Sequence, residues 1–318
     1  MKIGLAILGD YYDADTAVDL AVRAESNNFH SVWIPEHFCS ADAISILGYL
    51  SGATKRIKLA TGIIGFQTRH PVLSAMTFAS LDRLNGGRTI AGLGLSVVDW
   101  LDRLGIEHKK PLTIAKEALF IIKKLFDGDT LNFAGKYFTV KDMALLPKPK
   151  RRIPIFVAAV GRQMLSFAAE AGEGILLSAG SSTSYITSVS KVSSKKKPLI
   201  ASLILSSVGE RRNPLVMRSL MSMLSRPGRT ELMLGQTYEK ADILRFQKEL
   251  QRRRFNEAMS YLSDDVLDSL IVQGSFSECE KSISRFVAAG LYIPILMPAP
   301  STERSTLELI SRIGDPSE

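Results

Sequence analysis

The chain alternates short apolar runs with longer amphipathic runs over its first two thirds. Short apolar runs bounded by turn residues are typical of strands, whereas apolar residues that recur every three or four positions indicate helices. The strand-like runs are apolar on both faces, as expected of parallel strands that helices cover. We predict eight strands, at Ile3–Leu8, Ser31–Pro35, Ile57–Ile64, Thr89–Leu95, Ile153–Ala159, Gly174–Gly180, Leu199–Ser207 and Tyr292–Met297.

Helix patterns lie between the predicted strands, and several have recognisable ends. Pro71 and Pro111 suit the first helical positions, where the missing amide hydrogen has no helical partner in any case. Gly86, Gly87 and Gly128 suit helix termination, because glycine readily adopts the conformation that ends a helix. We predict helices at Ala14–Asn28, Ala43–Ala53, Val72–Leu84, Pro111–Asp127 and Arg162–Ala171.

Eight strands in βα alternation predict an α/β fold, a (β/α)8 TIM barrel. No GxGxxG follows strand one, and Gly92-Leu-Gly94 inside strand four is interpreted as close packing rather than as a phosphate loop. We predict a single domain over residues 1–318 with a helical insertion at 209–290, between strands seven and eight. Ser275 and Glu278 have the spacing of a capping box and predict the start of the last helix in this insertion.

Composition narrows the class of protein. The 318 residues are 46% hydrophobic and 23% charged, which is typical of a globular chain and excludes disordered and fibrous classes. The formal net charge of +8 favours an anionic partner. The basic runs are separated and lack interleaved aromatic residues or a nucleic-acid motif, so we predict no nucleic-acid partner.

Cysteine usage and the N-terminal pattern bear on location. Cys39 and Cys279 are far apart and form no CxxC pair, which indicates neither a disulfide framework nor a zinc site. The N-terminal residues do not have the pattern of a signal or transit peptide, and no apolar stretch reaches membrane-spanning length. We expect a reduced, cytoplasmic protein that does not bind a membrane.

Candidate chemistry lies where the predicted strands end, because active sites of (β/α)8 barrels form at that face. Glu36 and His37 follow strand two, and His70 follows strand three. A single histidine at a barrel mouth is more often a hydrogen-bonded structural group than a catalyst, but two at one mouth make acid–base chemistry an equal alternative. No HExxH, paired aspartates at ligand spacing or cysteine cluster occurs, so we predict no metal site.

An anion site is predicted where strand five runs directly into a helix. The free backbone amides of the first helical turn at Gly161, with Arg162 and Gln163 beside them, are suited to a phosphate. An ordinary turn with a surface arginine explains the same residues, and the pattern alone leaves both interpretations open.

The residues around the predicted mouth resemble the luciferase-like family of flavin- and deazaflavin-dependent oxidoreductases. The resemblance is closest to the branch of coenzyme F420-dependent methylenetetrahydromethanopterin reductases, and it covers essentially the whole chain. The segments that carry it are SVWIPEHF (31–38), RIKLATGIIGFQTRHP (56–71), LDRLNGGRTIAGLGL (81–95), LFDGDTLNFAGKYF (125–138), IPIFVAAVGRQMLSFAAEAGEGILL (153–177), SRPGRTELML (225–234), QGSFSECEKSI (273–283) and IPILMPAP (293–300).

The resemblance implies a deazaflavin ring at the barrel mouth and hydride transfer between that ring and a substrate. It implies a cis peptide bond at Gly62–Ile63 that supports the ring, with His37 and Glu36 at catalytic positions. The resemblance implies that Gly161, Arg162 and Gln163 hold the cofactor phosphate. Ile64 and Ala159 are the remaining candidate cofactor-binding residues, and Asp99 is the remaining catalytic candidate.

Two departures from the reductase branch bear on the substrate. Ala6 occupies the strand-one position at which those reductases have a glutamate, and Leu95–Val97 replace residues that line their pocket. We therefore expect either a related reaction on a different small-molecule substrate or a reductase whose acid is relocated to Glu36, Asp10 or Asp99.

The sequence predicts an F420-dependent oxidoreductase that works as a cytoplasmic homodimer. An FMN-dependent luciferase-like monooxygenase and a non-catalytic ligand-binding barrel are the alternatives that remain open at this point.

Overall fold

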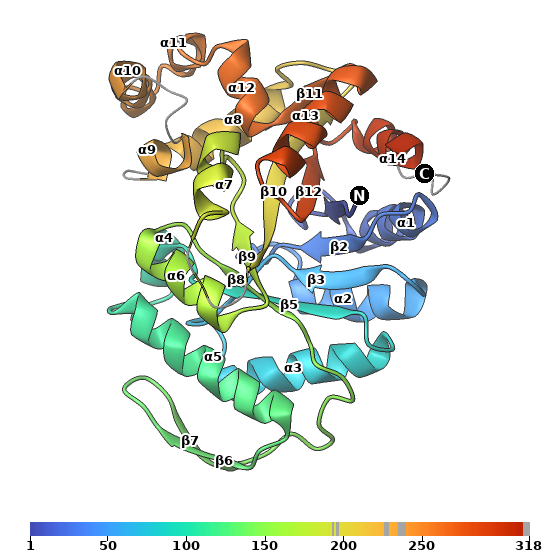
Figure 1. Cartoon of the computed structure of the whole chain (residues 1–318), viewed down its shortest axis with the longest axis vertical. Coiled ribbons are helices and arrows are strands. Elements are labelled where there is room, and N and C mark those ends of the chain that lie inside the picture. The colour runs from blue at the N-terminus through green and yellow to red at the C-terminus, as the bar shows by residue number, and fades with distance from the viewer. Residues whose placement is uncertain (193, 195–196, 226–228, 235–239, 314–318) are drawn as a thin grey trace.

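A computed structural model describes residues 1–192, 194, 197–225, 229–234 and 240–313. Eight parallel strands close into a barrel, because each pairs with two neighbours and the pairing returns to the first strand (Figure 1). The (β/α)8 fold and the predicted strands are confirmed. Around the barrel the strands follow the order β1 (Gly4–Ala6), β2 (Ser31–Ile34), β3 (Lys58–Thr61), β5 (Thr89–Gly94), β8 (Ile155–Ala158), β9 (Gly174–Leu177), β10 (Leu199–Val208) and β12 (Ile293–Pro298).

Helices cover the outside of the barrel, and the five helices predicted with bounds begin and end close to the predicted residues. Pro71 and Pro111 each occupy the first helical turn, and Gly128 ends its helix with φ of 89°. The Ser275–Glu278 capping box is present as predicted. These helices are α1 (Ala14–Ser26), α2 (Ala43–Ala53), α3 (Pro71–Leu84), α5 (Pro111–Asp127), α6 (Arg162–Ala171), α7 (Thr183–Val189), α13 (Phe276–Ala288) and α14 (Glu303–Ile313).

The strands are apolar on both faces because they separate two cores. Val32 and Ile34 point outward and pack beneath the helices, whereas Trp33 between them points into the barrel. Inside, the Trp33 ring meets the Phe156 ring edge-on with a centroid distance of 5.7 Å, and its indole N–H donates to Ser31 Oγ over 2.8 Å. The alternation along a strand thus places successive apolar side chains in different cores.

Gly92 and Gly94 allow close approach of neighbouring strands inside the barrel. A Cβ atom added at Gly92 would lie 1.8 Å from the carbonyl oxygen of Thr61, and one added at Gly94 would lie 2.7 Å from Cβ of Ala158. The packing interpretation of this GxG pair therefore agrees with the structure.

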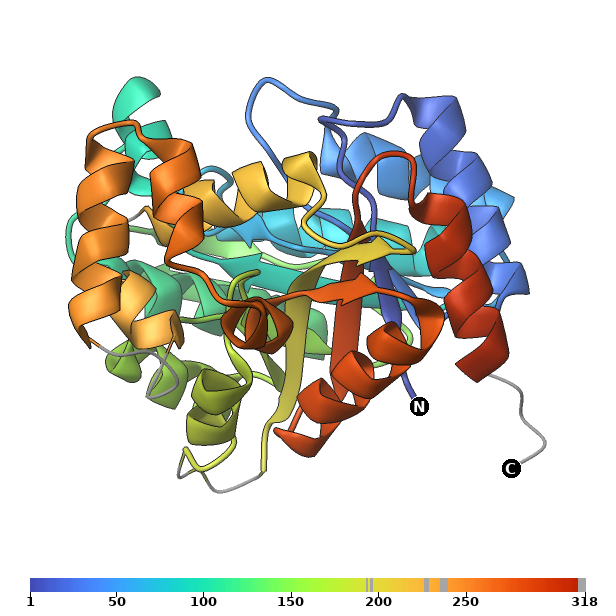
Figure 2. The ribbon, with the colours of Figure 1, turned by 90° about the horizontal axis from the view of Figure 1, so that it is seen from above.

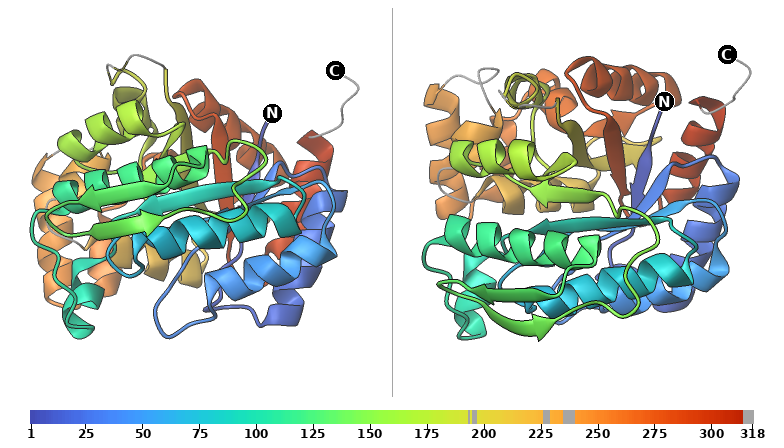
Figure 3. Two further views of the ribbon diagram at one scale, coloured as in Figure 1. Left: turned by 90° about the horizontal axis from the view of Figure 1, so that it is seen from below. Right: turned by 60° about the horizontal axis from the view of Figure 1, so that its bottom comes forward.

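Several short elements were not predicted. They are β4 (Ile64–Gly65), α4 (Val98–Arg103), the hairpin β6 (Leu131–Ala134) and β7 (Thr139–Met143), and β11 (Val272–Gly274). The hairpin lies outside α5 (Figure 3), and the Glu117 carboxylate on α5 accepts the backbone N–H groups of residues 136–138. The predicted insertion is not purely helical, because β11 within it pairs with β10.

The remaining helices gather beside one end of the barrel (Figures 1 and 2). They are α8 (Pro214–Leu224), α9 (Arg229–Leu234), α10 (Lys240–Gln251), α11 (Phe255–Ser260) and α12 (Asp264–Leu270). None of the helices in the described part of the chain is long and apolar enough to cross a membrane.

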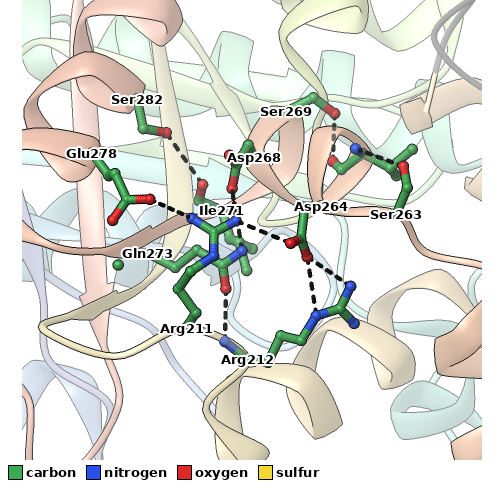
Figure 4. Close-up of polar contacts among 12 residues, drawn as sticks. Arg211, Arg212, Ser263, Asp264, Asp268, Ser269, Ile271, Gln273, Glu278 and Ser282 are labelled. Carbon is green, nitrogen blue, oxygen red and sulfur yellow. Dashed lines mark hydrogen bonds and ion pairs between the residues drawn. The ribbon is translucent and has the colours of Figure 1, made fainter.

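An arginine pair joins this helical region to the barrel just after β10 (Figure 4). Arg211 lies within 3.0 Å of Asp268 and 3.2 Å of Glu278, and Arg212 lies within 2.7 Å of Asp264. Burial alone would lower the pKa of the Arg211 guanidinium, but the surrounding carboxylates outweigh that effect and raise this pKa.

We expect Arg211→Gln to lower the free energy of unfolding by about 1–2 kcal/mol, because it removes charge-assisted hydrogen bonds from partly buried carboxylates. Urea unfolding monitored by circular dichroism measures the change. Arg23→Gln is the matched control, since Arg23 pairs with Asp19 on an exposed helix face and should change stability by less than about 0.5 kcal/mol. Equal effects of the two substitutions would contradict the assigned role of Arg211.

Candidate active site

A cavity of about 800 Å3 opens at the carboxyl ends of the barrel strands. Segments that follow β1, β2, β3, β5, β8 and β9 contribute to its wall, together with residues of β10, the end of β12 and one face of α8. Most of the lining side chains are apolar. The acidic and basic side chains at this wall are Asp10, Glu36, His37 and Arg218, and the Tyr11 phenol also lines it.

His37 and Asp10 form a pair at the edge of the cavity. Nδ1 of His37 lies 2.6 Å from Oδ2 of Asp10, so the other ring nitrogen, Nε2, is the one left for a ligand. The His37 ring also meets the Trp100 ring edge-on at 5.5 Å, and Trp100 lies 5.0 Å from the Phe38 ring. These contacts hold the imidazole in one orientation.

The Asp10 carboxylate is suited to orient the His37 imidazole. Burial works to raise the pKa of Asp10, but the neighbouring Ser40 hydroxyl and the His37 imidazole outweigh it, and the net effect is a lowered pKa. Asp10 therefore stays ionised and accepts the Nδ1 hydrogen, which fixes the imidazole tautomer that leaves Nε2 free.

Glu36 lines the same cavity, and its pKa is shifted in the opposite direction to that of Asp10. Burial raises the pKa of its carboxyl group and the charge of Asp42 adds to the rise, whereas Arg69 opposes it. The carboxyl group thus holds its proton at higher pH than an ordinary glutamate does. Two acidic side chains whose pKa values are shifted in opposite directions thus line one cavity with a histidine, a pattern typical of acid–base sites.

The cis peptide bond predicted at Gly62–Ile63 is present, and both residues line the cavity. Ile64 does not line it. Its side chain is buried in the outer core, beneath the helices.

The residues predicted to hold the cofactor after β8 lie on two different surfaces. Ala159 and Gly161 line the cavity, whereas Arg162 and Gln163 line a separate shallow groove that Lys116 also borders. Gly161 is the N-cap of α6 and offers no side-chain cap to the first helical amides. A Cβ atom added at Gly161 would have no neighbour within 4 Å, so the space beside it is open.

Two further candidates are not brought to the cavity. Asp99 projects from α4 and pairs with Arg103 over 3.2 Å, with two thirds of its side chain exposed. His70 accepts the backbone N–H of Val72 at the start of α3, over 3.3 Å, and its ring contacts Phe138. Among the described residues, no group of three or more histidine, cysteine or acidic side chains is arranged to hold a metal ion.

The structure adds cavity residues that the sequence pattern did not single out. Trp100 comes from α4, Tyr11 comes from the turn after β1, and Arg218 and Ser219 come from α8. The position of Trp100 after strand four was a usable signal. The contribution of α8 had no local signal, because it depends on where a distant segment packs.

The fold and its mouth cavity define a (β/α)8-barrel protein with a ligand site at the carboxyl ends of its strands. The model of the family described as luciferase-like monooxygenase matches residues 1–292, and the chain belongs to this family. The family resemblance inferred from the sequence is thereby confirmed. The motif at 225–234 lies partly outside the described residues.

Curated relatives match part of the chain. It is 34% identical over 181 residues to a 5,10-methylenetetrahydromethanopterin reductase of Archaeoglobus fulgidus, covering 56% of this chain and 53% of the relative. It is 27% identical over 193 residues to an F420-dependent glucose-6-phosphate dehydrogenase of Amycolatopsis mediterranei, covering 57% and 58%. The matches therefore span little more than half the length of these relatives.

Solved structures share the fold over nearly the whole chain. The coenzyme F420-dependent tetrahydromethanopterin reductase from Methanopyrus kandleri superposes with a TM-score of 0.82 at 19% identity, covering 98% of this chain and 97% of that one. An FMN complex of 3,6-diketocamphane monooxygenase from Pseudomonas putida superposes with a TM-score of 0.69 at 18% identity, covering 100% and 98%. These similarities establish the barrel fold.

Proposed function

We propose that this protein is an F420-dependent oxidoreductase that transfers a hydride between the deazaflavin and a small organic substrate. The observation that carries the proposal is the Asp10–His37 pair, which faces a mostly apolar cavity beside Glu36 and the Gly62–Ile63 segment. The curated relatives, which are F420-dependent enzymes or reductases that act on a methanopterin, support the same cofactor. We propose that its substrate differs from the substrates of these relatives.

The residues present fit a deazaflavin. The cavity volume of about 800 Å3 lies within the range of small-molecule and cofactor sites. Gly62 and Ile63 would hold the ring, and the open space at Gly161 admits a phosphate to the uncapped amides of α6. Arg162 and Gln163 lie on the adjoining groove, where they would attract the anionic part of the cofactor from outside the cavity.

When bound, the deazaflavin would supply the hydride chemistry, and the side chains of this chain handle protons and position. Nε2 of His37 would give a proton to a substrate oxygen or nitrogen or take one from it, while Asp10 holds the imidazole. Glu36 is the second acid. Strand β1 offers no carboxyl group, because its residues are Gly4, Leu5 and Ala6, and it is Ala6 that faces the barrel interior. The apolar walls would exclude water from the reacting atoms.

The pH dependence of turnover should report Glu36. A carboxylic acid with a raised pKa is protonated below that pKa, so activity that needs its proton should be full at low pH and fall as pH rises through the raised pKa. In Glu36→Gln we expect kcat to drop by about 10²-fold and the fall with rising pH to disappear. Steady-state rates over a pH series measure both effects.

Thermal unfolding serves as the control for this substitution. Glutamine avoids the cost of a buried charge, so Glu36→Gln should keep or raise the melting temperature at neutral pH. An unchanged pH profile in a folded Glu36→Gln protein would remove Glu36 from proton transfer.

Anaerobic oxidation of reduced F420 tests the reaction class. We expect turnover with pterin or carbonyl acceptors in the absence of oxygen. Turnover that requires FMN and oxygen would instead favour the monooxygenase alternative, and binding without turnover would favour a non-catalytic barrel. The homodimeric state, the cytoplasmic location and the single domain remain predictions from the sequence.

A further inference from the structure

Helix α8 presents three polar side chains, Arg218, Ser219 and Ser222, to the mostly apolar cavity, and we call them the polar stripe. The side chains of α8 that line the cavity recur with helical spacing, and Arg218 lies in the middle of them. Ser219 and Ser222 also line the cavity, within one turn of Arg218 along the helix. The opposite face of α8 is apolar and buries Met217, Leu220 and Leu224.

Arg218 is an exposed residue at the cavity and has no ion-pair partner among the described residues, whereas Arg211 and Arg212 just before α8 pair with carboxylates. The other charged groups of the cavity wall do not compensate it: Asp10 is bound to His37, and burial favours the neutral form of Glu36. A guanidinium placed on a cavity wall without a carboxylate partner is suited to a ligand that brings its own negative charge.

The location of this stripe indicates which part of a ligand it faces. The Tyr11 hydroxyl, which follows β1, lies 3.4 Å from Ser219 Oγ, so α8 meets the β1 edge of the cavity. Asp10 and His37 stand at the same edge. Gly161 follows β8, which lies four strands away in a barrel of eight and therefore opposite β1. The stripe is thus near the proton-transfer pair and across the barrel from the α6 amides.

We propose that Arg218, with the hydroxyls of Ser219 and Ser222, is a substrate subsite that binds the carboxylate or phosphate of an otherwise apolar molecule. The inference takes the cavity to be the substrate site of the proposed oxidoreductase. It assigns the substrate class: an apolar body that contacts the leucine and methionine walls, with one anionic group on α8.

A matched pair of ligands tests the subsite. The probes are 4-phenylbutyrate and its neutral amide, titrated by calorimetry into the protein with and without F420. We expect the carboxylate to bind about tenfold more tightly than the amide, because only the carboxylate can form a charge-assisted hydrogen bond with the guanidinium. Arg218→Gln should remove this preference and Arg218→Lys should keep part of it. Arg245→Gln is the control, since Arg245 pairs with Asp242 on α10 away from the cavity.

The outcomes separate this inference from the cofactor assignment. Equal affinities for carboxylate and amide, or a preference that persists in Arg218→Gln, would overturn the subsite. If Arg218→Gln weakens F420 but not the deazaflavin that lacks the phosphate and tail, the arginine binds the cofactor and the substrate subsite is overturned. If F420 fails to bind the wild type, the cofactor assignment fails, while a carboxylate preference in the unloaded protein still supports the subsite.

Discussion

Replacing His37 with alanine is expected to lower kcat by about 10²- to 10⁴-fold, the usual contribution of a positioned acid or base. The substitution removes Nε2 from the cavity and leaves the Asp10 carboxylate without its 2.6 Å partner. Steady-state rates with saturating F420 measure the loss. Because His37 is partly exposed and lies at a loop, the fold should survive, with an unchanged melting curve.

His108→Ala is the matched control for this experiment. His108 also bonds an aspartate, with Nε2 2.8 Å from Oδ1 of Asp102, but it lies outside the cavity. We expect its turnover to equal that of the wild type. If His37→Ala retains full activity, His37 has no part in proton transfer.

Gly92→Ala is expected to have the largest effect on stability, a loss of about 3 kcal/mol or more. The added methyl group would lie 1.8 Å from the Thr61 carbonyl oxygen, which belongs to backbone and cannot move without separating β3 from β5. The Thr61 hydroxyl donates to the Gly92 carbonyl oxygen and accepts from the Gly92 N–H. Displacement of Thr61 would disrupt both hydrogen bonds. Urea unfolding followed by circular dichroism measures the loss.

Gly48→Ala makes the same chemical change, but it should stabilise the protein. Gly48 lies within α2, and a Cβ atom there meets nothing within 4 Å. Alanine should raise the free energy of unfolding by about 0.5–1 kcal/mol, because it favours the helix over the unfolded chain. A Gly92→Ala protein as stable as the wild type would contradict the packing described for β3 and β5.

The barrel could be predicted from the sequence because its signals are local. Both faces of each strand are buried, so each strand appears as an apolar run, and prolines and glycines mark the helix ends at Pro71, Pro111 and Gly128. The β6–β7 hairpin was missed because few of its side chains are buried, so it has no apolar run, and β11 spans only three residues. Their positions depend on distant partners, such as the Glu117 carboxylate that binds the turn of the hairpin.

The candidate site was predictable only where residues directly follow a strand. Glu36 and His37 continue from β2 and reach the cavity. Asp99 does not, while its neighbour Trp100 does, because successive residues of a helix such as α4 point about 100° apart. Arg162 turns away from the cavity for a similar reason at the start of α6. Arg218 depends on the tertiary position of α8, which no local pattern encodes.

Spectroscopic titration of the purified protein with F420 and with FMN tests the central claim most directly. The deazaflavin and the flavin have different visible spectra, so each binding curve can be followed separately and in competition. We predict that F420 binds at least about tenfold more tightly than FMN, a difference of about 1.4 kcal/mol. Tighter binding of FMN, or no binding of F420, would contradict the assignment of this cavity to a deazaflavin.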